Sequence, residues 1–185
     1  MKTRPEILLH PNIPKPMHGL APRVIMGDAW WNENRQIAYR STDFHCAACG
    51  VHKRDAKYHQ WLEAHELYEM DYENGKMIFK ELVPLCHSCH NFIHSGRLQV
   101  LVDKGEIPES KQRDILKHGK QIIKAAGLKT PKPPTRCAEW SKWRMVFNGQ
   151  EYKGKFKSFD AWMDFYNPGW RQDEFSEEED YLQFD

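Results

Sequence analysis

Cysteine is the residue type whose spacing in this chain points most directly to chemistry. Of the five cysteines, four form two CxxC pairs, Cys46 with Cys49 and Cys86 with Cys89. Four thiolates at this spacing suit one tetrahedral Zn²⁺, and a site that uses four protein ligands is closed and structural. A redox CxxC would not need two matched pairs, and zinc ligation fits a reducing compartment better than disulfides do. We therefore expect a structural zinc site, with Cys137 left as a free thiol.

Three histidines near these cysteines could support hydrolytic chemistry. His90 and His94 follow the second CxxC pair one helical turn apart, so a helix would place both imidazoles on one face. Two imidazoles in this arrangement can hold a metal ion. His65 lies between the CxxC pairs, and a neutral imidazole can accept a proton from water near pH 7. Phosphodiester hydrolysis needs both parts, a general base and a cation that stabilises charge on the phosphate.

In their order along the chain, these residues resemble one known family. A CxxC pair, a hairpin histidine, the segment Leu82-Val-Pro-Leu-Cys-His-Ser-Cys-His90 and then His94 are similar to an HNH endonuclease of the zinc-containing ββα-metal type. Endonuclease VII-like resolvases share a similar layout. The resemblance covers residues 44–95. It implies that His65 is the general base and that His90 and His94 are ligands of a catalytic Mg²⁺, Mn²⁺ or similar divalent ion.

The chain departs from this family at one position. Many members carry an Asp or His ligand directly before the base, where this chain has Ala64. Glu63, Glu66 or water could complete the metal shell instead. In a second register, His65 would be a ligand and Glu66 the base. We favour His65 as the base because the pKa of a histidine lies closer to the working pH than that of a carboxylate.

Basic residues near this region are candidates for contact with nucleic acid. Lys53, Arg54 and Lys57 follow the first CxxC pair, and Arg97 follows His94. Their side chains could bind phosphates, which would position a substrate without reading its sequence. The alternative is that these side chains are simply solvated. Other nearby histidines are expected to be surface or supporting residues rather than ligands: His45, His52, His59 and His87.

The charge of the chain is unevenly distributed. The formal net charge is only +1, but residues 173–185 carry seven acidic side chains and no Lys or Arg. The rest of the chain therefore has 27 basic and 19 acidic side chains, a balance of +8. A basic body indicates contact with nucleic acid. The acidic tail would either compete for the same groove or act only as a solubilising segment.

Sequence patterns predict an α+β fold in five parts. These are a Pro-rich N-terminal arm and helix (1–43), a ββα-metal HNH core stabilised by a four-cysteine zinc knuckle (44–96), a basic helical segment (97–130), a small aromatic C-terminal hairpin–helix unit (131–172) and the acidic tail (173–185). Proline fixes φ and removes a donor, so the arm should be extended or looped across the body, with a helix only from Asp28 to Ser41.

Turn and cap signals locate the elements inside these parts. Asn74-Gly75 predicts a hairpin whose second strand covers residues 77–83 and whose first arm, near 60–68, has a period that also fits a short helix. A helix from His87 to Ser95 should end at Gly96. Further predictions are two helices in 97–130 separated at 105–108, a second hairpin at Asn148-Gly149, and a short aromatic helix capped by Ser158.

We therefore expect a metal-dependent HNH endonuclease that cuts duplex or branched DNA in the cytoplasm of a bacterial cell or a phage-infected host. No apolar run is long enough for a membrane span, and no signal peptide is evident. One alternative is a zinc-stabilised nucleic-acid or protein binding module without catalysis. Another is a structural zinc protein whose C-terminal unit recruits a protein partner or a second copy of the chain.

Overall fold

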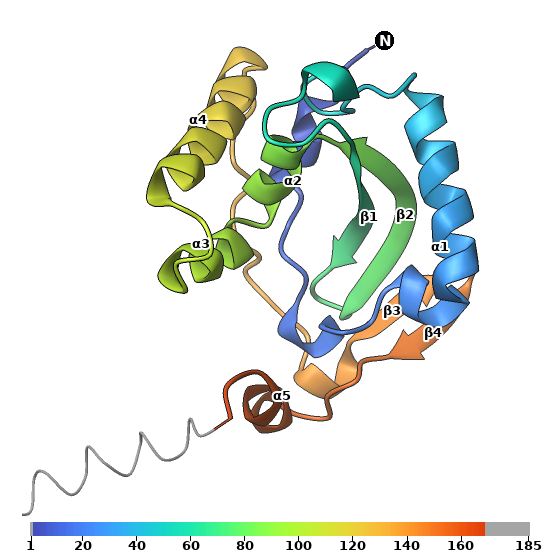
Figure 1. Cartoon of the computed structure of the whole chain (residues 1–185). Helices are drawn as coiled ribbons and strands as arrows, with labels where there is room; N and C mark the ends of the chain where they lie inside the picture. Colours follow the sequence, from blue (N-terminus) through green and yellow to red (C-terminus); the bar gives the residue numbers. More distant parts are fainter. Residues whose placement is uncertain (1, 169–185) are drawn as a thin grey trace, which may run out of the picture.

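Helices and one mixed sheet make up the fold, so the predicted α+β class is confirmed at this level. The structure is a computed structural model that describes residues 2–168, and the predicted acidic tail lies outside the described residues. The sheet has the order β1 (Glu63–Asp71), β2 (Lys76–Leu85), β3 (Arg144–Phe147), β4 (Gln150–Lys153). The five α-helices of this part are α1 (Pro22–Ser41), α2 (His87–Ile93), α3 (Ser95–Asp103), α4 (Glu109–Ala125) and α5 (Phe159–Tyr166). α1 lies along one side of the sheet, and α2, α3 and α4 gather on the other side (Figure 1).

The long hairpin of β1 and β2 is the centre of the sheet. The two strands pair antiparallel along their whole length, with one irregularity between Leu67 and Tyr68. Their turn contains Gly75, whose φ of 67° lies in the left-handed region that favours glycine. A Cβ at this position would also lie only 2.9 Å from the Cβ of Ala138. The predicted Asn74-Gly75 turn is therefore confirmed, and its glycine is needed for two reasons.

The predicted C-terminal hairpin extends the same sheet. β3 runs parallel to β2, with Met77 opposite Met145, and β4 pairs antiparallel with β3. Both methionines are fully buried and pack with Met17, Trp143 and Phe147 in one hydrophobic cluster. The C-terminal strands thus share a core with the central hairpin. As predicted, the Ser158 side chain accepts a hydrogen bond from an amide in the first turn of α5.

The first long helix begins earlier than predicted. α1 starts at Pro22, where a proline is tolerated because the first helical amide has no intrahelical partner. The helix kinks at Gly27, whose φ is 80° and ψ is 177°, directly before the predicted start at Asp28. Asp28 accepts a hydrogen bond from Arg23 at 2.9 Å. Trp30 packs against the cluster around the buried methionines, so it is a core anchor.

Two short helices meet at His94, and here the predicted helix end was wrong. α2 ends at Ile93 and α3 begins at Ser95, because His94 has φ −90° and ψ 41°, outside the helical region. Gly96, the predicted terminator, lies in the first turn of α3 instead. Because of this break, α3 runs in a different direction from α2, and Leu98 of α3 is buried. The predicted break between α3 and α4 is confirmed.

The N-terminal arm crosses the body, as its prolines predict, but it is not wholly extended. It forms two short 3-10 turns, Pro5–Leu9 and Lys15–Met17. Ile7 and Leu8 are buried in the hydrophobic cluster that surrounds the cysteines. The arm therefore packs as part of the core, and the residues after its first turn are held against β1.

Candidate metal centres

The two CxxC pairs meet in one cluster. Cys46 and Cys49 lie in a tight turn, while Cys86 and Cys89 lie at the start of α2. The backbone of the first pair is tied to the end of β2, since Ala47 donates its amide hydrogen to the Pro84 carbonyl at 2.8 Å. All four sulfur atoms lie within 4.8 Å of one another.

The spacing of these sulfurs fits a zinc ion. Sγ of Cys49 is 3.8 Å from Sγ of Cys86. Four sulfurs at about 2.3 Å from a tetrahedral Zn²⁺ would also lie about 3.8 Å apart. Contacts among the four thiols lower the pKa of Cys46 and Cys49 and raise the pKa of Cys86 and Cys89, so metal binding must displace protons from the second pair. The four-cysteine cluster can therefore hold a structural metal such as zinc, as predicted.

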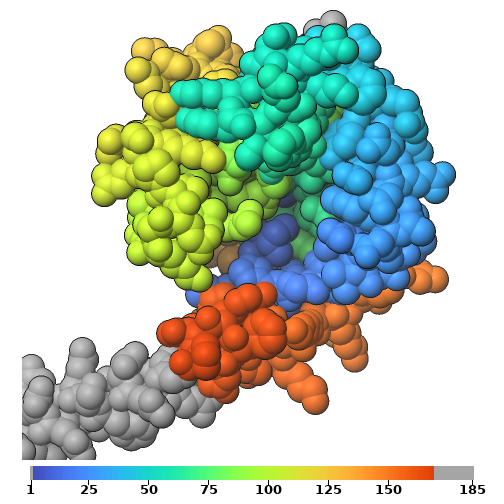
Figure 2. Space-filling model, in the orientation of Figure 1, coloured from blue at the N-terminus to red at the C-terminus, as the bar shows by residue number. Residues whose placement is uncertain are grey.

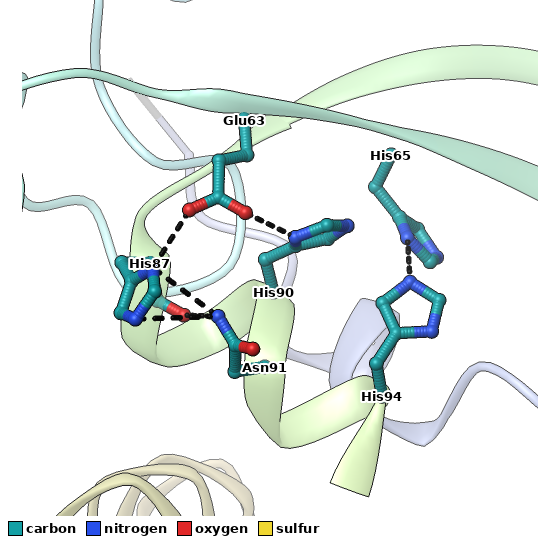
Figure 3. Close-up of polar contacts among 6 residues, drawn as sticks. All are labelled: Glu63, His65, His87, His90, Asn91 and His94. Atoms are coloured by element: carbon teal, nitrogen blue, oxygen red, sulfur yellow. Dashed lines mark hydrogen bonds and ion pairs between the residues drawn. The ribbon is translucent and has the colours of Figure 1, made fainter. Parts of the chain in front are cut away.

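The three candidate histidines also meet, although they come from separate elements. His65 lies on β1, His90 on α2 and His94 at the joint before α3. Each offers a ring nitrogen, and these atoms lie within 4.8 Å of one another. Nε2 of His94 is 3.2 Å from Nδ1 of His65 (Figure 3). Since metal–imidazole bonds are about 2.0–2.1 Å long, nitrogens this close can share one metal ion.

Glu63 lies on β1, the strand that carries His65, and it holds the ring of another member of the triad, His90. Its carboxylate accepts hydrogen bonds from Nδ1 of His87, at 2.8 Å, and from Nδ1 of His90 (Figure 3). Burial alone would raise the pKa of Glu63, but the bonds from His87 and His90 outweigh it and lower that pKa. The charged carboxylate thus fixes the His90 ring and leaves Nε2 as the nitrogen that can bind a metal, an arrangement common behind metal-ligating histidines.

Ala64 and Glu66 lie on the other face of β1. Side chains alternate along a strand, so the residues on either side of His65 leave the face opposite to the triad. Burial is the main cause that raises the pKa of Glu66. The group of ring nitrogens that could share a metal therefore consists of His65, His90 and His94, without either neighbour of His65.

His10 adds a fourth imidazole behind His65, and no spacing in the sequence singles it out. Its Nδ1 lies 3.4 Å from Nε2 of His65. Its Nε2 lies 2.9 Å from the backbone nitrogen of Tyr68 and 3.2 Å from the Tyr68 carbonyl oxygen. Burial, followed by the charges of His90, His94 and His10, lowers the pKa of His65. His65 is therefore neutral near pH 7, and a pKa of about 2 makes its ring a weaker proton acceptor than a free imidazole.

The four basic residues proposed from the sequence lie in three different settings. Arg97 is exposed at the start of α3. Arg97 also acts on the histidine site: the pKa of His94 is lowered to about 4, mainly by burial and to a smaller extent by the charges of His90 and Arg97. Lys57 forms an ion pair with Asp114 of α4 at 2.6 Å. The remaining two lie in the 3-10 turn before β1: Lys53 and Arg54.

Comparisons with known proteins add no relative to this description. No family model, no curated protein and no solved structure matches the chain. Within residues 2–168, none of the helices has the length and apolar character needed to cross a membrane. A four-cysteine cluster beside a histidine triad, both able to bind metal, is compatible with a zinc-binding HNH-like module.

Proposed function

We propose that this protein is a metal-dependent endonuclease of the HNH type, which hydrolyses DNA phosphodiester bonds. The supporting observation is that His65, on a hairpin strand, meets His90 and His94 of the helical segment that follows the cysteine cluster. A neutral imidazole next to a cation site is the combination that phosphodiester hydrolysis requires. The proposal depends on this grouping of three histidines. The α+β class and the charge of the chain would not support it by themselves.

His65 is the proposed general base. Nε2 of His10 accepts a hydrogen bond from the Tyr68 amide at 2.9 Å, so neutral His10 carries its proton on Nδ1, the nitrogen that faces Nε2 of His65. As the base, His65 would take the proton of the attacking water on Nδ1, which requires that nitrogen, 3.2 Å from Nε2 of His94, to be unprotonated when the metal is bound. Glu66 is a weaker candidate for the base, because the pleat of β1 directs its side chain to the opposite face.

His90 and His94 are the proposed ligands of the catalytic metal. A divalent ion such as Mg²⁺ or Mn²⁺ held there would stabilise negative charge on the scissile phosphate and the leaving oxygen. Glu63 acts in this proposal as the group that orients His90, rather than as a third ligand, since both its oxygens are engaged by histidines. Ala64 offers no ligand, so water and phosphate oxygens complete the shell.

The cysteine cluster and the surface complete the proposal. Zinc on Cys86 and Cys89 fixes the first turn of α2 and therefore the direction of the neighbouring His90. In the orientation of Figure 1, the surface is hollowed between α3 and α1, with the N-terminal arm in its floor (Figure 2). We assign this hollow as the approach for duplex or branched DNA, and Arg97, which is exposed in the first turn of α3, as a candidate contact to a phosphate.

Ala64 favours one other candidate, a zinc-stabilised module that binds nucleic acid or protein without cutting. A supercoiled-plasmid assay separates the two. An endonuclease converts the plasmid to open circles in Mg²⁺ or Mn²⁺, and EDTA stops the reaction. Retention of the plasmid in a gel shift with no conversion in either metal would favour the binding module. Since one active site cuts one strand, open circles should appear before linear plasmid.

A further inference from the structure

A histidine outside the triad contacts the cysteine cluster. His118, in the middle of α4, places Nε2 3.5 Å from Sγ of Cys89. It also contacts the thiol of Cys86. No CxxC spacing includes His118, because α4 comes to the cluster only through tertiary packing. The contact is therefore a feature of the fold that local sequence patterns do not reveal.

The packing of α4 on α2 holds His118 in this place. Ile115, one turn before it, is fully buried. Gly119, the next residue, is so close to α2 that a Cβ there would lie 2.2 Å from the ring of Phe92. Real Cβ atoms do not approach other atoms this closely, so the helices reach this distance only with glycine at position 119. This close packing of α4 on α2 thus keeps His118 beside the sulfurs.

The cluster needs hydrogen-bond donors of this kind. Zn²⁺ bound by four thiolates carries excess negative charge, and N–H groups around a metal site stabilise its ligands. Cys89 is fully buried, so its sulfur has no access to solvent for this purpose. Cys86 and His118 line a cavity of about 310 Å³ on the side of the cluster that faces α4. Loss of the donor should therefore make the metal easier to remove.

We propose that His118 donates its Nε2–H to the Cys89 thiolate of the zinc-loaded cluster and so couples retention of the metal to docking of α4. Coupling of this kind is reciprocal: the bound metal favours the docked helix by the same free energy with which the docked helix favours the metal. His118 is a positioning residue of the structural metal site. The inference does not depend on whether the protein cuts DNA.

The test measures the rate of zinc release from the full-length, zinc-loaded protein to an excess of a coloured chelator. His118→Phe keeps a flat ring between the helices but removes the donor, so it should release zinc about tenfold faster or more. His118→Gln keeps an N–H group and should release zinc at a rate closer to that of the unmodified protein. Gln121→Ala is the matched control, since Gln121 lines the same cavity from α4 one turn further on.

Two results of the zinc-release assay would overturn the proposal. In the first, His118→Phe releases zinc as slowly as the unmodified protein. In the second, His118→Gln releases zinc as fast as His118→Phe, which would show that ring shape and not the donor matters. The thiolate-to-metal absorption of the Co²⁺-loaded protein gives an independent readout: it should shift in His118→Phe and stay unchanged in Gln121→Ala. An unchanged spectrum in both variants would also contradict the hydrogen bond.

Discussion

The substitution Glu63→Gln tests how the histidine site is held together. The two carboxylate oxygens accept hydrogen bonds from His87 and His90, and only 23% of the Glu63 side chain is exposed. Glutamine keeps the shape of the side chain, so the fold should persist. It replaces one of the two acceptor oxygens with an NH₂ group, which can only donate.

The cost of this change follows from the geometry of His90. An NH₂ group facing Nδ1 of His90 would donate to it, and the ring proton would then move to Nε2, the nitrogen proposed to bind the metal. If the amide turns the other way, His87 loses its acceptor and His90 loses the negative charge behind it. Removal of such a supporting carboxylate lowers metal affinity about 10–100-fold. This factor corresponds to about 1.4–2.8 kcal/mol of binding free energy.

The assay is a Mn²⁺ titration of the zinc-loaded protein, followed by calorimetry or by the Mn²⁺ electron paramagnetic resonance signal. Glu69→Gln is the control, because Glu69 lies on the same strand with its side chain 63% exposed and paired with Lys80. We expect unchanged affinity in Glu69→Gln and at least a tenfold loss in Glu63→Gln. Equal affinity of the two variants would refute the supporting role of Glu63.

Three further perturbations test other parts of the structure. Chelation of the cysteine-bound metal should lower Tm in calorimetry, reversibly with Zn²⁺, because the metal joins the Cys46 turn to α2; an unchanged Tm would contradict a structural site. Gly119→Ala should destabilise the fold by about 1–3 kcal/mol in urea unfolding, since the methyl group meets Phe92; an unchanged midpoint would contradict the close packing. Neutral His18 accepts a hydrogen bond from Trp162 of α5, and burial lowers the His18 pKa below 6.5. That stabilisation is complete above pH 6.5 and is lost as the pH falls below it, so α5 should become more sensitive to proteolysis in acid; equal sensitivity at both pH values would contradict this.

Short-range patterns were sufficient to predict the parts of the site that are close in sequence. Two thiols on one turn predicted the cysteine cluster, and Asn74-Gly75 predicted the hairpin that carries His65. The one-turn spacing of His90 and His94 predicted that their rings lie on the same side, and both belong to one metal-capable group. Each of these signals depends on turn geometry or on the helical period, which the local sequence determines.

The remaining features depend on contacts between distant segments, which local patterns do not encode. His10 reaches His65 only because the arm is buried across β1, and His118 reaches Cys89 only because α4 packs closely on α2. The helix break falls at His94 rather than at the glycine that marks such breaks in sequence. The parallel pairing of β3 with β2 also joins segments that no turn connects.

The most direct test of the central proposal is the single-turnover rate of plasmid nicking in Mg²⁺ for the unmodified protein and for His65→Ala. Both proteins must contain equal zinc and be saturated with metal, with Mn²⁺ affinity measured in parallel. We expect His65→Ala to nick about 10²–10⁴-fold more slowly while retaining its Mn²⁺ affinity, because in this proposal His65 is the base and His90 and His94 are the ligands. A parallel loss of Mn²⁺ affinity would show that His65 is itself a ligand in the triad. Nicking by His65→Ala at the unmodified rate would contradict the assignment of His65 as the general base.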